Sequence, residues 1–303
     1  MEASFFSKSP SKHFSLKVTE PNKLLLFLQE KLKGYSHSSI KALLKNEKVL
    51  INHKHIIKQF DYPLKKGDDV SILSLKNKDR ILQHPKLNII FEDESLIIIN
   101  KKEGLLSVAT AHKEEQTAYN ILNEYIKSKE KNKQIYILHR LDRETSGLMM
   151  FAKSKAIQTI MQEKWKENII ERTYVALVHN IPKKPNGIIT SFLIEDKSTK
   201  MHITSDAEKG QKATTRYKTL KKNKSFALLE LQLETGRKNQ IRVHLQSIGH
   251  PIVGDKKYDS PSNPLQRLCL HASTLSFIHP QSKEKMTFTC AVPECFLEFI
   301  HQE

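Results

Sequence analysis

Residues 139–149 read H-R-L-D-R-E-T-S-G-L-M and give the strongest indication of how this chain folds. A single carboxylate, Asp142, lies between two arginines, of which the first is Arg140. Apolar runs at 135–138 and 147–151 predict a strand, a polar loop and a second strand. A loop at the end of a sheet is a frequent place for catalytic side chains. The same pattern also fits an exposed hairpin with solvated charges, so other parts of the chain have to decide.

The 303-residue chain carries 50 Lys and Arg against 33 Asp and Glu, a formal charge of +17. Such an excess favours a polyanionic partner, which means a nucleic acid or an anionic membrane surface. No apolar run is long enough to span a bilayer, and residues 1–20 lack the apolar stretch of a secretory signal. We therefore expect a nucleic acid as the partner, no membrane association and a monomeric protein.

The three cysteines Cys269, Cys290 and Cys295 form an odd number, which is typical of a reducing cytoplasm. They could surround a metal together with His271, but the spacing Cys-x4-Cys has no second pair, so we expect no metal. The nine glycines form neither a phosphate-binding nor a dinucleotide-binding fingerprint, and we expect no cofactor. The excess of lysine over arginine is consistent with an AT-rich bacterial genome.

Four segments follow from composition and periodicity: a polar tail at 1–15, a small domain at 16–75, a charged linker at 76–86 and a large domain at 87–303. In the small domain, residues 24–32 and 40–45 have helical apolar spacing. Ser38 or Ser39 is a candidate N-cap of the second helix, which carries Lys41 and Lys45 on its outer face. Strands are expected at 49–52 and, after a turn at 64–69, at 70–72.

Strands predominate in the large domain. Patterns of apolar residues predict them at 88–91, 96–99, 135–138, 147–151, 174–178, 188–192, 213–220, 227–233 and 268–275. Helices are predicted at 117–129, 156–165 and 240–248. Runs of strands with a few helices between them indicate an α+β fold with a mainly antiparallel sheet.

A second polar cluster occupies residues 233–245, which read L-E-T-G-R-K-N-Q-I-R-V-H-L. A strand is expected to end near Gly236 and a helix to begin near Asn239. Arg237, Lys238 and Arg242 then lie near the start of that helix. Cations there oppose the helix dipole unless an anion is close. Asp142 or a phosphate group would supply this anion; an exposed cap screened by water is the alternative.

The two clusters together resemble the RluA family of RNA pseudouridine synthases, over residues 87–295. Residues 139–147 match its H-R-L-D-x-x-T-S-G motif at every fixed position, and residues 236–244 match G-R-x-x-Q-I-R-x-H. Two departures are Lys102, where the family usually has proline, and Asn239, where many members have histidine. Lys102 leaves the shape of its loop open.

Residues 17–75 resemble the alpha-L RNA-binding module that is appended to many RNA-modifying enzymes. Glu47 and His53 stand where that module usually has glycine, so we expect those turns to be made differently. An unrelated small α+β domain is the alternative. Under the resemblance, Lys41 and Lys45 form the RNA-facing surface, because phosphate contacts need exposed cations.

The family resemblance implies cofactor-free isomerisation of uridine to pseudouridine in structured RNA. Asp142 is the expected nucleophile, attacking either the base or C1′ of the sugar, and Arg242 the counter-charge that keeps it ionised in a dry pocket. Tyr174 is expected to pack on the uracil and to help move the C5 proton. The target base has to be flipped out of its helix. Arg140 is expected either to fill the space that the base leaves or to hold the flipped strand.

Arg237 and Lys238 are expected to contact phosphates. His139 and His244 are expected to have packing and hydrogen-bonding roles, with acid or base roles as the alternative. Large-subunit ribosomal RNA is the expected substrate, with transfer RNA as the alternative. Two other functions stay open at this point: a non-catalytic RNA-binding protein of ribosome assembly, and a glycosylase that releases the base.

Overall fold

The computed structural model describes residues 13–32, 37–52, 54–73, 82–109 and 116–302. The chain divides into two compact units, Met1–Gln83 and His84–Glu303. Most of the linker expected at 76–86 lies outside the described residues. The end of this segment is not a linker, because Gln83–His84 forms strand β7 of the large sheet. No helix in the described ranges is long and apolar enough to cross a membrane.

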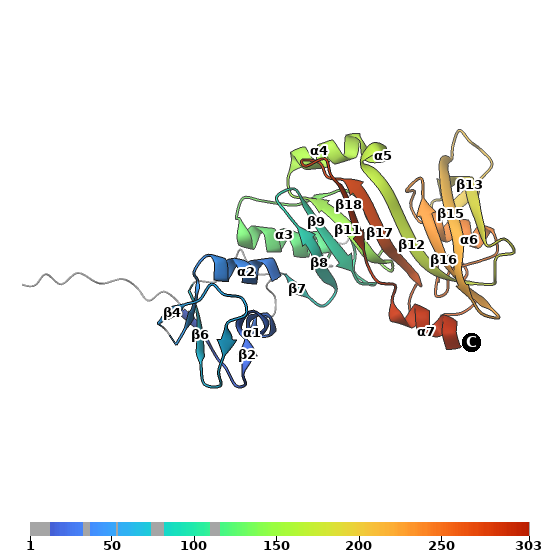
Figure 1. Cartoon of the computed structure of the whole chain (residues 1–303). Helices are drawn as coiled ribbons and strands as arrows, with labels where there is room; N and C mark the ends of the chain where they lie inside the picture. Colours follow the sequence, from blue (N-terminus) through green and yellow to red (C-terminus); the bar gives the residue numbers. More distant parts are fainter. Residues whose placement is uncertain (1–12, 33–36, 53, 74–81, 110–115, 303) are drawn as a thin grey trace, which may run out of the picture. The chain divides into compact units, whose positions relative to one another are not determined.

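The first unit has a four-stranded sheet in the order β1-β6-β3-β4 and a two-stranded sheet of β2 and β5. Its elements are β1 (His13–Lys17), β2 (Asn22–Lys23), α1 (Leu24–Lys31), α2 (His37–Lys45), β3 (Val49–Ile51), β4 (His55–Ile56), β5 (Pro63–Leu64) and β6 (Asp69–Leu73) (Figure 1). The tail expected at 1–15 is therefore too long, since β1 begins at His13 and pairs antiparallel with β6. Backbone pairing with a distant strand makes this short segment ordered.

Helices α1 and α2 bury their predicted apolar faces in the core of the first unit. Helix α2 begins at His37, so Ser38 and Ser39 lie inside it and neither is its N-cap. Lys41 and Lys45 are exposed, as expected for the outer face. The turn after α2 was expected to differ from a glycine turn because Glu47 stands there. This expectation was wrong, since Glu47 itself adopts the left-handed conformation typical of glycine (φ 59°). His53 lies outside the described residues.

The second unit is built on a twelve-stranded sheet with the order β14-β13-β15-β16-β12-β17-β11-β9-β8-β7, to which β10 adds beside β11 and β18 beside β17. The strands are β7, β8 (Leu87–Glu92), β9 (Leu96–Lys101), β10 (Tyr136–Ile137), β11 (Ser146–Ala152), β12 (Ile169–His179), β13 (Asn186–Glu195), β14 (Met201–Thr204), β15 (Gln211–Lys222), β16 (Phe226–Leu233), β17 (Leu270–Ile278) and β18 (Lys285–Thr289). Apart from the parallel pair β11–β17, the strand ladders described for this sheet are antiparallel. The predicted α+β class with a mainly antiparallel sheet is confirmed.

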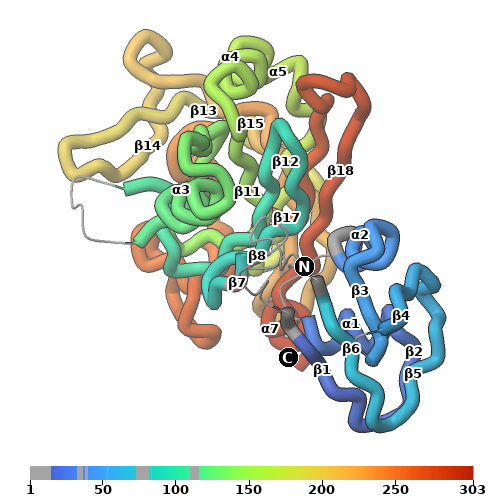
Figure 2. Tube along the Cα trace, turned by 90° about the vertical axis from the view of Figure 1, so that its left-hand side faces the viewer, coloured from blue at the N-terminus to red at the C-terminus, as the bar shows by residue number. Residues whose placement is uncertain are grey.

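The helices of the second unit are α3 (Ala118–Lys129), α4 (Lys155–Glu163), α5 (Trp165–Asn168), α6 (Gln240–Ser247) and α7 (Glu294–Gln302). Tyr125 and Lys129 of α3 bind Glu92 at the end of β8, and Figure 2 shows this helix beside that part of the sheet. Helix α6 packs against β13, β14 and β15, and α7 against β16. The sequence patterns missed β14, β18 and α7, whose short or partly polar runs are stabilised by their neighbours in the sheet.

The central parallel pair depends on a glycine. Gly147 of β11 lies opposite Ala272 of β17 and has a φ of 112°. A Cβ atom added to Gly147 would lie 2.2 Å from the backbone oxygen of Ala272. The two backbones can approach this closely only because residue 147 has no side chain. This contact lies one residue beyond the start of β11, directly after the loop that contains Asp142.

We expect Gly147→Ala to lower the free energy of unfolding by about 3 kcal/mol, since it adds backbone strain and a clash that only a shift of β17 can relieve. Urea denaturation measures the change. Gly249→Ala is the matched control, because Gly249 also has a positive φ (79°) but a Cβ there meets nothing within 4 Å. Its cost should be about 1 kcal/mol. Equal losses in the two variants would contradict the close-approach argument.

Candidate active site

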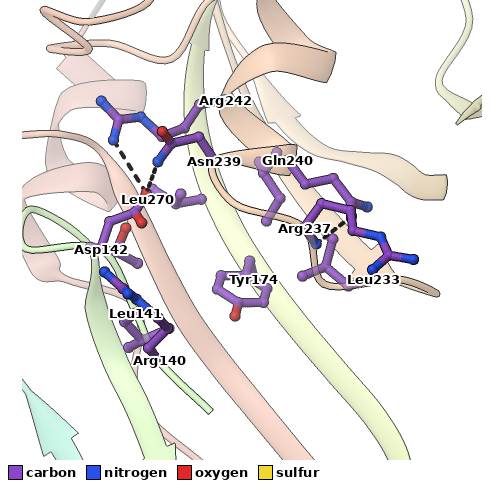
Figure 3. A pocket seen from close by; sticks show the side chains of 12 residues that line it. Arg140, Leu141, Asp142, Tyr174, Leu233, Arg237, Asn239, Gln240, Arg242 and Leu270 are labelled. Atoms are coloured by element: carbon purple, nitrogen blue, oxygen red, sulfur yellow. Dashed lines mark hydrogen bonds and ion pairs between the residues drawn. The ribbon is translucent and has the colours of Figure 1, made fainter. Parts of the chain in front are cut away.

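Residues that are distant in the sequence line one cavity of about 70 Å³ above the centre of the large sheet. Asp142 comes from the β10–β11 loop, Tyr174 from β12 and Arg242 from α6. Arg140 and Arg237 line the same cavity, and in Figure 3 the Tyr174 ring lies between Asp142 and Arg237. The structure therefore brings together the three residues expected to be catalytic and two of those expected to bind RNA.

The backbone on both sides of Asp142 is held by the segment after β9. The hydroxyl of Ser107 donates a hydrogen bond to the Leu141 carbonyl (2.6 Å) and accepts one from the Leu141 amide (3.1 Å). On the other side, the Arg143 carbonyl accepts hydrogen bonds from the Gly104 amide (2.8 Å) and from Nζ of Lys101 (3.1 Å). The loop is thus fixed at the residues directly before and after the carboxylate.

Lys101 is fully buried and donates to three backbone carbonyls, those of Lys102, Leu105 and Arg143. Burial lowers the pKa of its ammonium group to about 8, against the opposing effect of the Asp142 charge. The loop shape that Lys102 left open is also explained here. The Lys102 amide donates to the Lys86 carbonyl (2.8 Å), a contact that the family's proline cannot make.

The Asp142 side chain is 27% exposed, and one of its two oxygens takes both of its hydrogen bonds. Oδ2 accepts from Nδ2 of Asn239 (2.5 Å) and from Nη1 of Arg242 (3.2 Å). The expected contact between Arg242 and Asp142 is therefore present. Oδ1 accepts no hydrogen bond from the described residues, which leaves this oxygen available to a substrate at the cavity.

Arg242 makes its shortest contacts with a second carboxylate, that of Asp255. Nε and Nη2 of Arg242 donate to the two oxygens of Asp255, both at 2.7 Å, and the Asp255 side chain is fully buried. Burial alone would lower the pKa of the guanidinium, but the hydrogen bonds and charge of Asp255, then of Asp142, raise it above its ordinary value. Arg242 thus stays charged and presents Nη1 to Asp142.

Asn239 is a site residue whose role the sequence patterns missed. It directly precedes α6 in the left-handed conformation (φ 50°), which asparagine tolerates better than most residues. Its Oδ1 accepts a hydrogen bond from the Tyr258 hydroxyl (3.2 Å), and this orients Nδ2 towards Asp142. The sequence did show that this position has asparagine where many family members have histidine. The contact of this asparagine with Asp142 becomes visible only in the folded structure.

Tyr174 and the two motif histidines are uncharged at neutral pH. Burial raises the pKa of the Tyr174 phenol, so the side chain remains protonated. Burial and the Arg172 charge lower the pKa of His139 to about 3, and its Nε2 accepts from the Met150 amide (3.0 Å). Burial lowers the pKa of His244 to about 4, and both of its ring nitrogens bind hydroxyl groups. The geometry of both histidines fits packing and hydrogen bonding.

The remaining residues expected to contact RNA do not line this cavity. Lys238 pairs with Glu195 at the end of β13 and is not among the residues that line the cavity. Lys41 and Lys45 belong to the first unit. Among the described residues, no group of three His, Cys, Asp or Glu side chains is arranged to hold a metal ion.

The buried pair of Arg242 and Asp255 makes a prediction about stability. Asp255→Asn leaves a buried guanidinium with one partner fewer, so the free energy of unfolding should fall by about 3–5 kcal/mol in urea denaturation. Glu144→Gln is the matched control, because Glu144 contacts the same guanidinium at 3.5 Å but its side chain is 51% exposed. We expect it to change stability by less than about 1 kcal/mol. Equal losses of unfolding free energy in the two variants would contradict a special contribution of the Arg242–Asp255 pair to stability.

Comparison with known proteins gives one family. A family model described as RNA pseudouridylate synthase matches residues 95–247. The uncharacterized RNA pseudouridine synthase YhcT of Bacillus subtilis is 31% identical, over 84% of this chain and 84% of that protein. The ribosomal large subunit pseudouridine synthase C of Buchnera aphidicola (subsp. Schizaphis graminum) is 30% identical, over 91% of each.

A solved structure has the same fold. Human RNA pseudouridylate synthase domain containing 4 superimposes with a TM-score of 0.59 at 27% identity, over 70% of this chain and 91% of that chain. The match covers both motif clusters and extends over most of the relatives' length. On this sequence match and this shared fold, the chain belongs to the RluA family and is an RNA pseudouridine synthase.

Proposed function

We propose that Asp142 is the nucleophile of this synthase and that Oδ1 is its attacking oxygen. The observation that carries the proposal is the asymmetry of this cavity-lining carboxylate: Oδ2 accepts hydrogen bonds from Asn239 and Arg242, while Oδ1 has no hydrogen-bond partner among the described residues. An ionised carboxylate can attack a sugar carbon or a base and can later leave, as in retaining glycosidases.

Two routes fit this geometry. In one, Oδ1 bonds to C1′ of the target uridine as the N1–C1′ bond breaks. In the other, it adds to the base before that bond breaks. In both, the uracil rotates after its N1–C1′ bond breaks, and C5 bonds to C1′. The carboxylate leaves, from C1′ in the first route and from the base in the second. Water takes the C5 proton and N1 takes up a proton, so the product is an isomer of the substrate. Tyr174 packs on the uracil during these steps; because it remains protonated, we assign it no role as a base.

The target base is out of reach in a helix and has to be flipped into the cavity. Arg140, exposed on the same loop as Asp142, is the side chain that we assign to the space the base leaves. Arg237 lies across the cavity, and we assign it to a backbone phosphate. Together these two cations of the cavity lining supply attraction to RNA.

Asp142→Asn should abolish the reaction, lowering its rate roughly 10⁴-fold or more, the size of effect seen when other enzymes lose a nucleophile. The measurement is release of the C5 hydrogen from labelled uridine in total ribosomal RNA of cells that lack the gene. RNA affinity should remain nearly unchanged. Glu163→Gln, which removes an exposed acid of α4, is the control and should release hydrogen at the wild-type rate.

The alternatives predict other results. A base-releasing glycosylase would produce free uracil and abasic RNA, and a non-catalytic assembly protein would release no hydrogen in any variant. Equal rates for Asp142→Asn and wild type would remove Asp142 from the chemistry.

We propose large-subunit ribosomal RNA as the substrate. Support comes from two Buchnera relatives that are named ribosomal large subunit pseudouridine synthase C. One matches 91% of this chain, and the other is 33% identical to it. Transfer RNA is the alternative. Mapping of pseudouridines in total RNA with and without the gene decides between them.

We also infer that the first unit binds RNA through Lys41 and Lys45, which are one helical turn apart and exposed on α2. Replacing both with Gln should reduce the slope of log affinity against log salt by roughly 1.4–1.8, since each phosphate contact contributes about 0.7–0.9. Filter binding of ribosomal RNA at several salt concentrations gives the slope. The pair Lys65 and Lys66 in the β5–β6 turn is the control: the same loss of charge there should leave the slope unchanged.

A further inference from the structure

A second and larger cleft adjoins the active-site cavity. It has a volume of about 420 Å³, against about 70 Å³ for the cavity beside Asp142, and the two share Arg140 and Arg237 as lining residues. Its far wall is formed by Trp165 of α5 and Arg172 of β12. A volume of this size lies within the range of about 300–1,000 Å³ that binds small organic ligands.

The contacts of Arg172 in this cleft are packing contacts, with Trp165 and with Gly236. Its guanidinium carbon lies 5.9 Å from the centre of the Trp165 ring. On another side it packs on Gly236, where an added Cβ would lie 2.6 Å from Nη1 of Arg172. No hydrogen bond or ion pair of Arg172 is found with the described residues, so its donors are available to a ligand. Arg172 also lies two residues before Tyr174 on one strand.

The cleft carries a positive charge that its own lining does not neutralise. Four cations line it, Arg140, Lys166, Arg172 and Arg237, while Glu234 is the only carboxylate among the described residues of its lining. That carboxylate is already paired with Arg216, whose Nε lies 2.6 Å from its Oε1. Uncompensated cations around a hollow attract an anionic ligand, and arginine forks bind phosphate oxygens in particular.

Trp165 adds an aromatic surface to these charges. It is the one tryptophan of the chain, and its ring is partly exposed although its inner part packs against the core around Leu138. Nucleic-acid clefts commonly combine cations along the backbone with aromatic rings on which bases stack. The cleft offers both, directly beside the place where a flipped uridine has to enter.

We propose that this cleft binds the nucleotide next to the flipped uridine, with its phosphate on Arg172 and its base against Trp165. This rests on the proposed function, because it takes RNA with a uridine at Asp142 as the ligand. The small cavity takes the target base, and the cleft takes the neighbouring nucleotide that Arg140 separates from it.

The single tryptophan makes the proposal directly measurable. The probe is a decaribonucleotide of adenosines with one central uridine, bound to the full-length Asp142→Asn variant so that no turnover occurs. Trp165 emission should fall along the same curve as binding, which is followed in parallel by anisotropy of a labelled copy. A decamer of the same charge with abasic sugars should bind without this fall in emission.

Arg172→Gln in the same background should weaken binding of the decamer about tenfold. It should also reduce the salt slope by roughly 0.7, the value of one phosphate contact in a single strand. Arg172→Lys should restore the slope. The matched control is Lys183→Gln, which removes an exposed cation beyond the opposite end of β12 and should leave affinity and slope unchanged. Thermal melting confirms that each variant is folded.

Either of two results overturns the proposal: unchanged Trp165 emission at saturating decamer, or the same salt slope for Arg172→Gln and Lys183→Gln. Because these measurements need no turnover, they are independent of the hydrogen-release assay. If that assay fails while the emission falls and the slope drops, the RNA subsite stands and the chemistry assigned to Asp142 does not.

Discussion

The site depends on one buried charge, the guanidinium of Arg242. Its side chain is only 4% exposed, and an uncompensated cation at such a place would be strongly destabilising. Asp255 compensates it with two short hydrogen bonds, and this leaves Nη1 for Asp142. The start of α6, the loop with Asp255 and the β10–β11 loop therefore have to meet at one point, and the proposed nucleophile lies there.

A second constraint acts on the loop itself. Ser107 and Lys101 hold the residues on either side of Asp142, and the absence of a side chain at Gly147 lets β11 approach β17 directly after it. These contacts restrict the backbone while the carboxylate remains 27% exposed. A carboxylate fixed in this way needs little reorganisation when a ligand arrives, which is the advantage of a rigid site.

Much of this arrangement was predictable. The strand–loop–strand around Asp142, the α+β class and the pairing of Arg242 with Asp142 all agree with expectations from motifs and periodicity. Other features were not, because they depend on contacts between distant segments. Strand β1 is ordered by β6, Glu47 adopts a left-handed turn that its residue type disfavours, and Asn239 owes its role to Tyr258.

The family, the candidate site residues and the attraction to RNA could be inferred from the amino-acid sequence alone, because they depend on residue identity, short spacing and net charge. Tertiary structure decided which oxygen of Asp142 is available, which carboxylate compensates Arg242 and where a large cationic cleft adjoins the cavity. The physical reason is that burial and hydrogen-bond geometry arise only when strands and helices far apart in the chain pack together.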